Sequence, residues 1–399
     1  MFNPEIMKWA RESAGLSLAD AAHRLDIAKV ERLIAYETGA ETPSRPVLLR
    51  MAKQYRRSLL TFYLQSPPPR GNRGEDFRTV STDFKVDDDA KIDALIRDLR
   101  VRQSLVHSAM EDDETQPIPL IGSTHMSEGI SHTIEVIQSA LKLDLQTFRS
   151  KRKIEDAFSL LRTHVENIGI FVMLKGDLGS HHSSIAVNTF RGFAIADPIA
   201  PFIVINDQDA KSAWSFTLLH ELAHLCLGAT GISGSISDIQ IEKFCNEVAS
   251  EFLLPLEEFN KIQISNITNI ETLISEISDY ANKRNISRSL VAYKLFNKNI
   301  ISKEIWKEIE SRIRLLWQQE KLNKKLKNNL ASNGPNYYTT KRHKLGDAIL
   351  EFANRALNSG NLSPVKAAKI LDVKPRSVHP LLINISQSGY NHRMSGLVG

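Results

Sequence analysis

Three residues near the middle of the chain have the types and spacing for metal-assisted hydrolysis: His220, Glu221 and His224, within FTLLHELAHL. Residues four apart lie on one face of a helix, so both imidazoles can bind one metal ion while Glu221 projects beside it. Two neutral histidines and a carboxylate leave a fourth zinc position for water, whose pKa the metal lowers toward neutrality. We therefore predict a zinc (Zn2+) site in which Glu221 is the general base of peptide hydrolysis.

The third metal ligand is expected from a second helix that contains IEKFCNEVASEFLLP, whose first glutamate lies 18 residues beyond His224. We assign this role to Glu242. Asn246 lies four residues further on the same face, and we expect it to hydrogen-bond a ligand histidine and fix its tautomer. Glu247 and Glu251 are competing carboxylates. Cys245 is expected to pack in the core, because a buried thiol is its commoner role beside an available carboxylate.

These elements need a scaffold, and the pattern of apolar residues predicts a mainly α protein with a small β-sheet (α+β). Residues 88–110 predict one amphipathic helix, 133–168 two helices, and the chain after about 211 further helices to near its end, with a break at 332–336. Four short β-branched segments predict the sheet: GIFVML, SSIAVN, GFAIAD and PFIVIN. We expect PFIVIN, just before the motif helix, to pair with an extended peptide substrate.

The first 66 residues predict a separate bundle of short helices, closed by the run Pro67-Pro68-Pro69. Ser17 can cap a helix LADAAHRL, and a turn and a second helix over about 28–36 follow. Such a second helix can lie in the major groove of double-stranded DNA, where Lys29 and Arg32 are best placed to contact it. A protein-binding or dimerising module is the alternative, and Glu31 on the same helix would repel phosphate.

Two family resemblances follow from these motifs. Residues 7–57 resemble the XRE (Cro-like) helix-turn-helix family, which carries a Tyr36-Glu37-x-Gly39 close, a following proline and a further helix VLLRMAKQY. FTLLHELAHL followed by E-x-x-x-N-x-x-A-x-x-F-L-L-P is similar to the ImmA/IrrE metallopeptidases, over about 155–260. That resemblance implies a zincin-like domain in which His220, His224 and Glu242 bind zinc and Glu221 is catalytic. LSPVKAAKILDVKPRSV, over 362–378, has a weaker helix-turn-helix likeness, and no repeat of fixed period is found.

The predicted organisation has four parts: 1–66 helix-turn-helix, 67–110 linker and amphipathic helix, 111–260 metallopeptidase, and 261–399 a helical C-terminal region. No apolar run reaches the roughly 18 residues of a spanning helix, and the first residues lack a signal-peptide core, so we expect a cytoplasmic protein with no membrane partner. Two cysteines, Cys226 and Cys245, fit buried thiols in a reducing compartment.

Charge is unevenly distributed along the chain, whose net charge is +5. Residues 1–66 hold 10 Lys/Arg and 7 Asp/Glu, and residues 301–344 hold 11 and 4. Basic ends suit nucleic acid or an acidic partner, although a solvated helix surface fits the second region equally well.

The resemblance to ImmA/IrrE proteins implies cleavage of a DNA-binding repressor or an antitoxin-type partner. We predict a site-specific zinc endopeptidase that regulates transcription, with DNA binding by the N-terminal domain. The alternative is a non-proteolytic DNA-binding transcriptional regulator or antitoxin of a toxin-antitoxin pair. A third hypothesis is a toxin-sequestering module that uses the basic residues 301–344. A homodimer is considered, but the sequence leaves the oligomeric state open.

Overall fold

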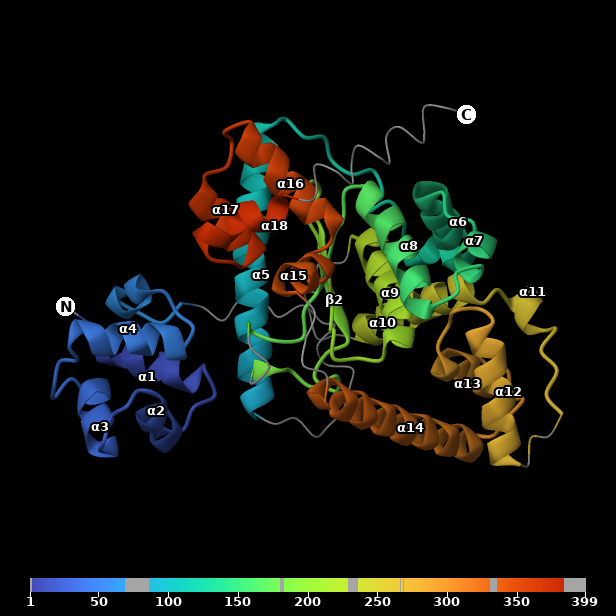
Figure 1. Ribbon diagram of the computed structural model, residues 1–399, viewed down its shortest axis with the longest axis horizontal. Coiled ribbons are helices and arrows are strands. Elements are labelled where there is room, and N and C mark those ends of the chain that lie inside the picture. Colours follow the sequence, from blue (N-terminus) through green and yellow to red (C-terminus); the bar gives the residue numbers. More distant parts are fainter. Residues whose placement is uncertain are drawn as a thin grey trace. The chain divides into compact units, whose positions relative to one another are not determined.

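The computed structural model describes residues 2–68, 86–179, 183–228, 236–265, 267, 269–330 and 336–383 (Figure 1). The chain groups into two units, residues 1–101 with 176–190, and residues 102–175 with 191–399. Helices dominate, and the described strands form one three-stranded sheet, so the predicted fold class is confirmed. Over the described part of the chain, no helix combines the length and the apolarity needed to cross a membrane.

The N-terminal unit begins with a bundle of short helices around its own core. Their bounds are α1 (Pro4–Glu12), α2 (Leu18–Arg24), α3 (Val30–Thr38), α4 (Arg45–Gln54) and the 3-10 helix η1 (Leu59–Tyr63). Ser17 caps α2 as predicted, since its side chain accepts a hydrogen bond from the amide of Asp20. Gly39 ends α3 with φ +79°, a left-handed conformation that glycine adopts without strain.

A buried ion pair ties the first and third helices of this bundle together. Arg11 of α1 donates from Nε and Nη2 to the two carboxylate oxygens of Glu37, at 2.7 and 2.9 Å. Arg11 also donates to the carbonyl of Leu16, just before α2. Glu37 of the Tyr36-Glu37-x-Gly39 segment therefore has a structural role within the bundle.

Helix α5 (Val86–Asp112) confirms that residues 88–110 are helical, and residues 69–85 of the predicted linker lie outside the described residues. The region predicted as two helices over 133–168 holds three: α6 (Gly129–Leu141), α7 (Leu145–Arg149) and α8 (Ile154–Asn167). Lys142 adopts φ +50° and ends α6, and Asp144 then caps α7 through the amides of Gln146 and Thr147. The extra break therefore has a local cause in a left-handed residue followed by a cap.

The sheet contains β1 (Phe171–Leu174), β2 (Gly192–Ile195) and β3 (Phe202–Ile205) in the order β1-β3-β2. Strand β3 is central, because it pairs in parallel with β1 and antiparallel with β2. Every residue of β1 and β3 is buried, which fits their continuous apolar sequences.

The predicted strand SSIAVN is wrong, because residues 183–188 form a 3-10 position and turns. Ser183 accepts a hydrogen bond from the amide of Leu178, and the amide of Thr189 donates to the carbonyl of Ala186. Ile185 is fully buried. Ile185, which suggested a strand, is therefore a buried residue of a loop.

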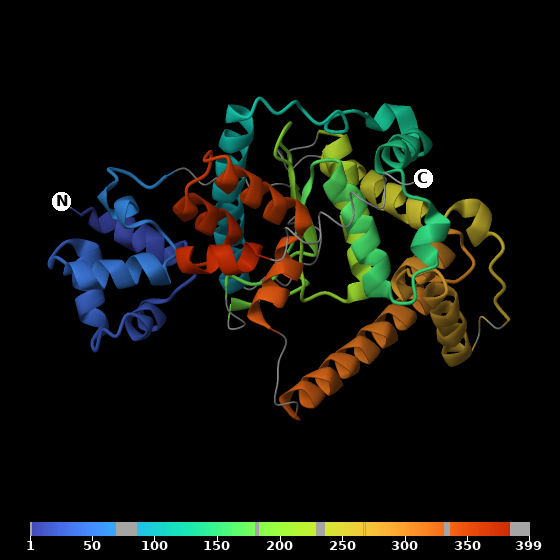
Figure 2. The same ribbon diagram turned by 45° about the horizontal axis from the view of Figure 1, so that its top comes forward.

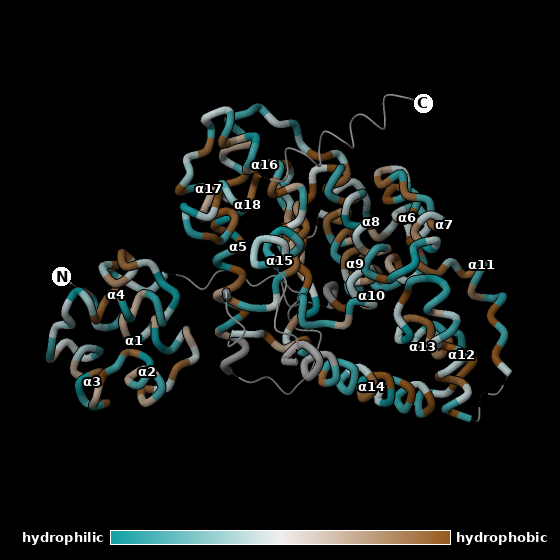
Figure 3. Tube along the Cα trace, viewed as in Figure 1, coloured by the Kyte–Doolittle hydropathy of each residue, from teal (hydrophilic) through white to brown (hydrophobic). Residues whose placement is uncertain are grey.

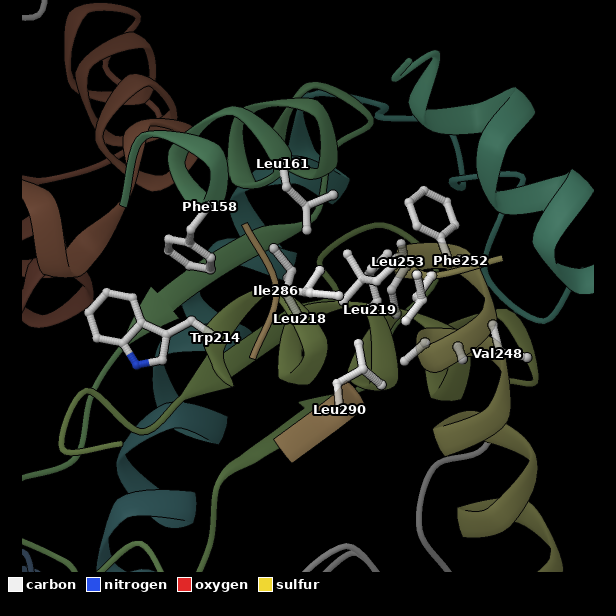
Figure 4. Close-up of a cluster of buried hydrophobic side chains, with 14 of the residues drawn as sticks. Phe158, Leu161, Trp214, Leu218, Leu219, Val248, Phe252, Leu253, Ile286 and Leu290 are labelled. Atoms are coloured by element: carbon white, nitrogen blue, oxygen red, sulfur yellow. The ribbon is translucent and has the colours of Figure 1, made fainter. Parts of the chain in front are cut away.

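The helices after the sheet are α9 (Trp214–Cys226), α10 (Ile236–Leu253), α11 (Leu256–Phe259), α12 (Ile270–Asn282), α13 (Arg288–Asn297) and α14 (Lys303–Leu330). Figure 4 shows side chains from three elements pointing toward one another: Phe158 and Leu161 of α8, Leu218 and Leu219 of α9, and Phe252 and Leu253 of α10. Both cysteines lie fully buried in this core as free thiols, as predicted, and burial raises the pKa of Cys226 to about 12. Along α14, hydrophilic and hydrophobic residues alternate (Figure 3).

Four short helices follow near the C-terminal end of the described chain: α15 (Tyr337–Leu345), α16 (Asp347–Asn358), α17 (Pro364–Leu371) and α18 (Val378–Leu382). They lie side by side in both ribbon views (Figures 1 and 2), and α15 and α16 connect them to the rest of the domain, α15 by packing against β1 and α16 by packing against β1 and α8. The side chain of Arg162 on α8 donates to the carbonyls of His343 and Val172, and therefore joins α15 to strand β1.

Candidate metal centre

The motif helix α9 lies at the centre of the core, packed between the sheet and helices α6, α8 and α10. Eleven of its thirteen residues are buried, including Glu221 and His224. A helix that is apolar on most of its circumference is stable only when its neighbours cover it, which explains this position. The imidazoles are therefore held on a rigid element.

The structure brings three predicted site residues together. Nε2 of His220 and Nε2 of His224 lie 3.1 Å apart. Glu242, on α10, places Oε2 3.4 Å from the Nε2 of His220 and Oε1 3.3 Å from the Nε2 of His224. Within the described residues these three side chains form a group that could hold a metal ion.

The separations between these atoms suit zinc. A tetrahedral ion with bonds of about 2.0–2.2 Å separates neighbouring ligand atoms by roughly 3.3–3.5 Å. The distances of 3.1, 3.3 and 3.4 Å lie close to that value. The side chains of Glu242 and His224 are 14 and 6% exposed, so a cation would also compensate the burial of the carboxylate.

Glu221 lies beside this group under the first residue of β2. Its side chain is buried, with 2% of the residue exposed. A Cβ atom placed on Gly192 would lie 2.9 Å from Oε1 of Glu221 and 2.4 Å from Cγ2 of Thr217. Glycine at this position thus allows the strand to approach the carboxylate closely.

The competing residues of α10 have other contacts. Glu251 pairs with Lys294 at 2.8 Å and accepts a hydrogen bond from the amide of Leu256. Glu247 lies close enough to Tyr293 to help raise the pKa of that phenol, although burial is the larger cause. Cys245 is fully buried in the hydrophobic core.

The predicted hydrogen bond from Asn246 is not made to His220. Nδ1 of His220 is buried and has no hydrogen-bond partner among the described residues. Asn246 itself is half-buried on α10, one turn beyond Glu242. Its proposed role in orienting a ligand ring therefore finds no support at His220.

The prediction that PFIVIN pairs with substrate is wrong, because β3 has a strand on each side. Strand β2 is the edge strand on the side of α9, and the β1 edge is contacted by α15 and Arg162. We chose PFIVIN as the substrate-binding strand because it directly precedes the motif helix in the sequence. In the structure it is the central strand, and the order of the strands cannot be inferred from the sequence.

Lys29 and Arg32 lie at the start of α3, where Lys29 is the N-cap residue. Both are exposed, and Arg32 lies 3.4 Å from Glu41 and over the ring of Tyr36. Their positions allow contact with a partner, but acidic Glu31 and Glu41 surround them.

Two imidazoles and a carboxylate that converge within one helix pair, with a further carboxylate on the motif helix, form the donor set of a metallopeptidase. Residues 166–296 match the family model of the IrrE N-terminal-like domain, which describes a peptidase family. The matched segment includes the sheet, α9 and α10, so this part of the chain carries a domain of the metallopeptidase type. No curated protein and no solved structure matches the chain.

Proposed function

We propose that the chain is a zinc-dependent, site-specific endopeptidase that regulates transcription by cleaving a DNA-binding repressor or an antitoxin-type partner. The observation that carries the proposal is the convergence of His220, His224 and Glu242 at separations suited to tetrahedral zinc. The match to the IrrE N-terminal-like peptidase family supports it. The repressor or antitoxin substrate rests on the resemblance to ImmA/IrrE proteins.

In this mechanism His220, His224 and Glu242 would hold the zinc ion, and Glu221 would transfer the proton. When bound, zinc would supply a Lewis acid that polarises the scissile carbonyl and lowers the pKa of water. The Glu221 carboxylate accepts a proton from the attacking water and delivers it to the leaving amine nitrogen. Its burial beneath Gly192 limits competing solvent contacts and keeps the carboxylate beside the metal ligands.

An extended substrate would add to β2 at the edge opposite β3. The carbonyl of Arg191 accepts a hydrogen bond from the amide of Asn206, so the backbone groups of Arg191 face β3. Because the direction alternates along a strand, the backbone groups of Gly192 and Ala194 face away from β3. Backbone pairing there would place a peptide above Glu221 without demanding a particular sequence. Docking on other surfaces would then supply selectivity.

We further propose that residues 1–66 form an XRE-type helix-turn-helix domain that binds double-stranded DNA through Lys29 and Arg32. The capped α2, the turn and α3 support this assignment. A non-proteolytic DNA-binding regulator or antitoxin is the second candidate function, because the capped α2, the turn and α3 support DNA binding without requiring a peptidase activity.

The test compares cells that express the wild-type protein, Glu221→Gln, and Glu247→Gln as a matched control on α10. New protein N-termini are identified by terminal proteomics, and zinc is measured in each purified protein by mass spectrometry. We expect zinc in all three and new termini in the wild type and control, with cleavage reduced roughly 10²–10⁴-fold by Glu221→Gln. Identical termini in all three strains would overturn the peptidase and favour the non-proteolytic regulator.

A further inference from the structure

The helix α17 and its flanks repeat the sequence of α2 and its flanks. Residues 16–26 read LSLADAAHRLD and residues 362–372 read LSPVKAAKILD, so six of eleven positions are identical at a constant offset of 346. The identities fall on Leu16, Ser17, Ala21, Ala22, Leu25 and Asp26, and on their counterparts Leu362, Ser363, Ala367, Ala368, Leu371 and Asp372. The next residue is aliphatic in both copies.

The two copies also share their backbone structure. Ser17 and Ser363 each cap the helix by accepting a hydrogen bond from the amide three residues on. Asp26 and Asp372 both adopt φ +54°. The amide that follows each aspartate donates to the carbonyl of the second alanine, at 2.9 Å in the first copy and 3.0 Å in the second.

This closing hydrogen bond is common at helix C-termini and also occurs after Asn285, so by itself it is not diagnostic. The cap, the buried alanine pair, the buried leucine and the left-handed aspartate occur together in one register in both copies. A second helical segment follows each turn, α3 in the first copy, and η6 (Pro375–Ser377) with α18 in the second. The C-terminal copy therefore has the local architecture of a helix-turn-helix.

The charges of the two copies differ. Residues 17–37 hold three Lys/Arg and four Asp/Glu, a net charge of −1. The equivalent residues 363–383 hold four Lys/Arg and one Asp, a net charge of +3. Because phosphate attraction supplies most non-specific affinity for DNA, the C-terminal copy is the better suited of the two.

The basic side chains of the second copy are accessible. Lys366, Lys369, Lys374, Arg376 and His379 are all exposed. The buried faces of α17 and α18 point instead into the helical group through Ala367, Ala368, Val378 and Leu381. The exposed basic side chains therefore lie on α17, on the segment between α17 and α18, and on α18 itself.

The one acidic residue of this copy does not oppose phosphate, because other cations neutralise it. Asp372 Oδ2 lies 2.9 Å from Nζ of Lys175, 3.2 Å from Nη2 of Arg102 and 3.3 Å from Nζ of Lys341. These cations hold the pKa of Asp372 well below its usual range, against the opposing effect of burial. Lys175 directly follows β1, so the turn of the motif is attached to the end of the sheet.

We propose that residues 363–383 are a second helix-turn-helix that binds double-stranded DNA, with Lys374 and Arg376 contacting phosphates as the helix that follows approaches the major groove. This function is independent of the peptidase, because none of these residues belongs to the metal centre. It supplies more of the attraction to DNA than α2 and α3, since only this copy is basic.

The test measures binding of the full-length protein to a 30-base-pair random-sequence DNA duplex by fluorescence anisotropy over a range of salt concentrations. The variants are Lys374→Ala/Arg376→Ala and, as a matched removal of two exposed charges from the same unit, Lys303→Ala/Lys307→Ala on α14. Lys29→Ala/Arg32→Ala tests the N-terminal copy, and Lys374→Arg/Arg376→Lys preserves charge. Circular dichroism melting confirms that each variant is folded.

We expect Lys374→Ala/Arg376→Ala to weaken duplex binding at least about tenfold near 0.1 M salt and to reduce the slope of log affinity against log salt by roughly 1.8. The charge-preserving pair and the α14 pair should bind like the wild type. Unchanged affinity and slope in Lys374→Ala/Arg376→Ala would overturn the proposal, as would equally tight binding of a single-stranded RNA of the same length. Neither result bears on the peptidase, which Glu221→Gln tests separately.

Discussion

Gly192 lies so close to Glu221 that a Cβ atom at position 192 would come within 2.9 Å of the carboxylate oxygen Oε1. The same atom would lie 2.4 Å from Cγ2 of Thr217, one turn earlier on α9. Strand β2 and helix α9 therefore pack at a distance that a side chain would prevent. The absence of a side chain at one strand position thereby sets the position of the proposed general base.

Gly192→Ala is expected to shift Glu221 and to lower cleavage of a validated substrate at least about tenfold, because the added methyl group overpacks the strand and helix. Overpacking of this kind costs about 1–3 kcal/mol of stability. Zinc content should stay at the wild-type level, since the three ligands lie on α9 and α10. The comparison variant is Thr217→Ser, which removes the nearer clashing methyl and should restore part of the loss when combined with Gly192→Ala. Full activity in Gly192→Ala would contradict this account of the strand.

Glu242→Gln is expected to lower zinc affinity by at least about 100-fold, because a neutral amide replaces the charged ligand of a two-histidine site. Competition with a chromophoric chelator measures the affinity. Glu247→Gln, five residues along the same helix, is the matched control and should keep wild-type affinity. Equal affinities in the two variants would show that another residue completes the site.

Glu166 predicts a specific pH dependence of stability. Burial raises the pKa of Glu166 to about 7, although Arg162 beside it acts in the opposite direction. Folding therefore favours the neutral carboxyl, and its contribution is complete below about pH 4.5 and is lost as the pH rises through about 7. As the pH rises from about 4.5 to above 7, the free energy of unfolding of the wild type should fall by up to about 3 kcal/mol relative to that of Glu166→Gln, whose side chain does not titrate. Urea unfolding at several pH values checks this, and parallel pH profiles would refute it.

Gly346→Ala is expected to destabilise the junction between α15 and α16. Gly346 adopts φ +88° and ψ 163°, and a Cβ atom there would lie 2.1 Å from Oε1 of Glu166. Backbone strain and the clash together should cost at least about 3 kcal/mol. Gly360→Ala, which also has a positive φ but meets nothing within 4 Å, separates the strain from the clash. Similar melting temperatures for both variants would mean that the contact with Glu166 carries no energy.

The sequence predicted features whose cause is local. The helix of His220 and His224, the cap at Ser17 and the helix over 88–110 each depend on spacing within one segment, and the structure contains all three helices. Glu242 could be predicted as the third ligand because it lies four residues before Asn246, on the same face of a predicted helix, and because E-x-x-x-N fits the ImmA/IrrE pattern. Its approach to both imidazoles then follows from the packing of α10 against α9.

Features that depend on pairing between distant segments could not be predicted. Strand β3 lies between β1 and β2 because β1 pairs with it in parallel, and the sequence PFIVIN does not indicate which strands pair with it. The wrong strand prediction at residues 183–188 has a similar cause. Ile185 is apolar because it is buried, and a buried residue in a loop has the same sequence pattern as a residue in a short strand. The role of Gly192 was equally hidden, because a glycine in a strand gives no sign of what lies beneath it. The helix-turn-helix likeness of residues 362–378 was predicted from the sequence, but two copies of LSxxxAAxxLD 346 residues apart form no repeat of fixed period.

The burial of α9 determines how the histidine pair behaves before any ion arrives. Because nearly the whole helix is enclosed by the sheet and by other helices, its amide hydrogens should exchange with solvent mainly when the surrounding domain unfolds globally. Metal capture would then require little ordering of His220 and His224, so most of its entropic cost falls on the side chain of Glu242, which lies on the neighbouring helix α10. An apoprotein with this helix intact should load quickly.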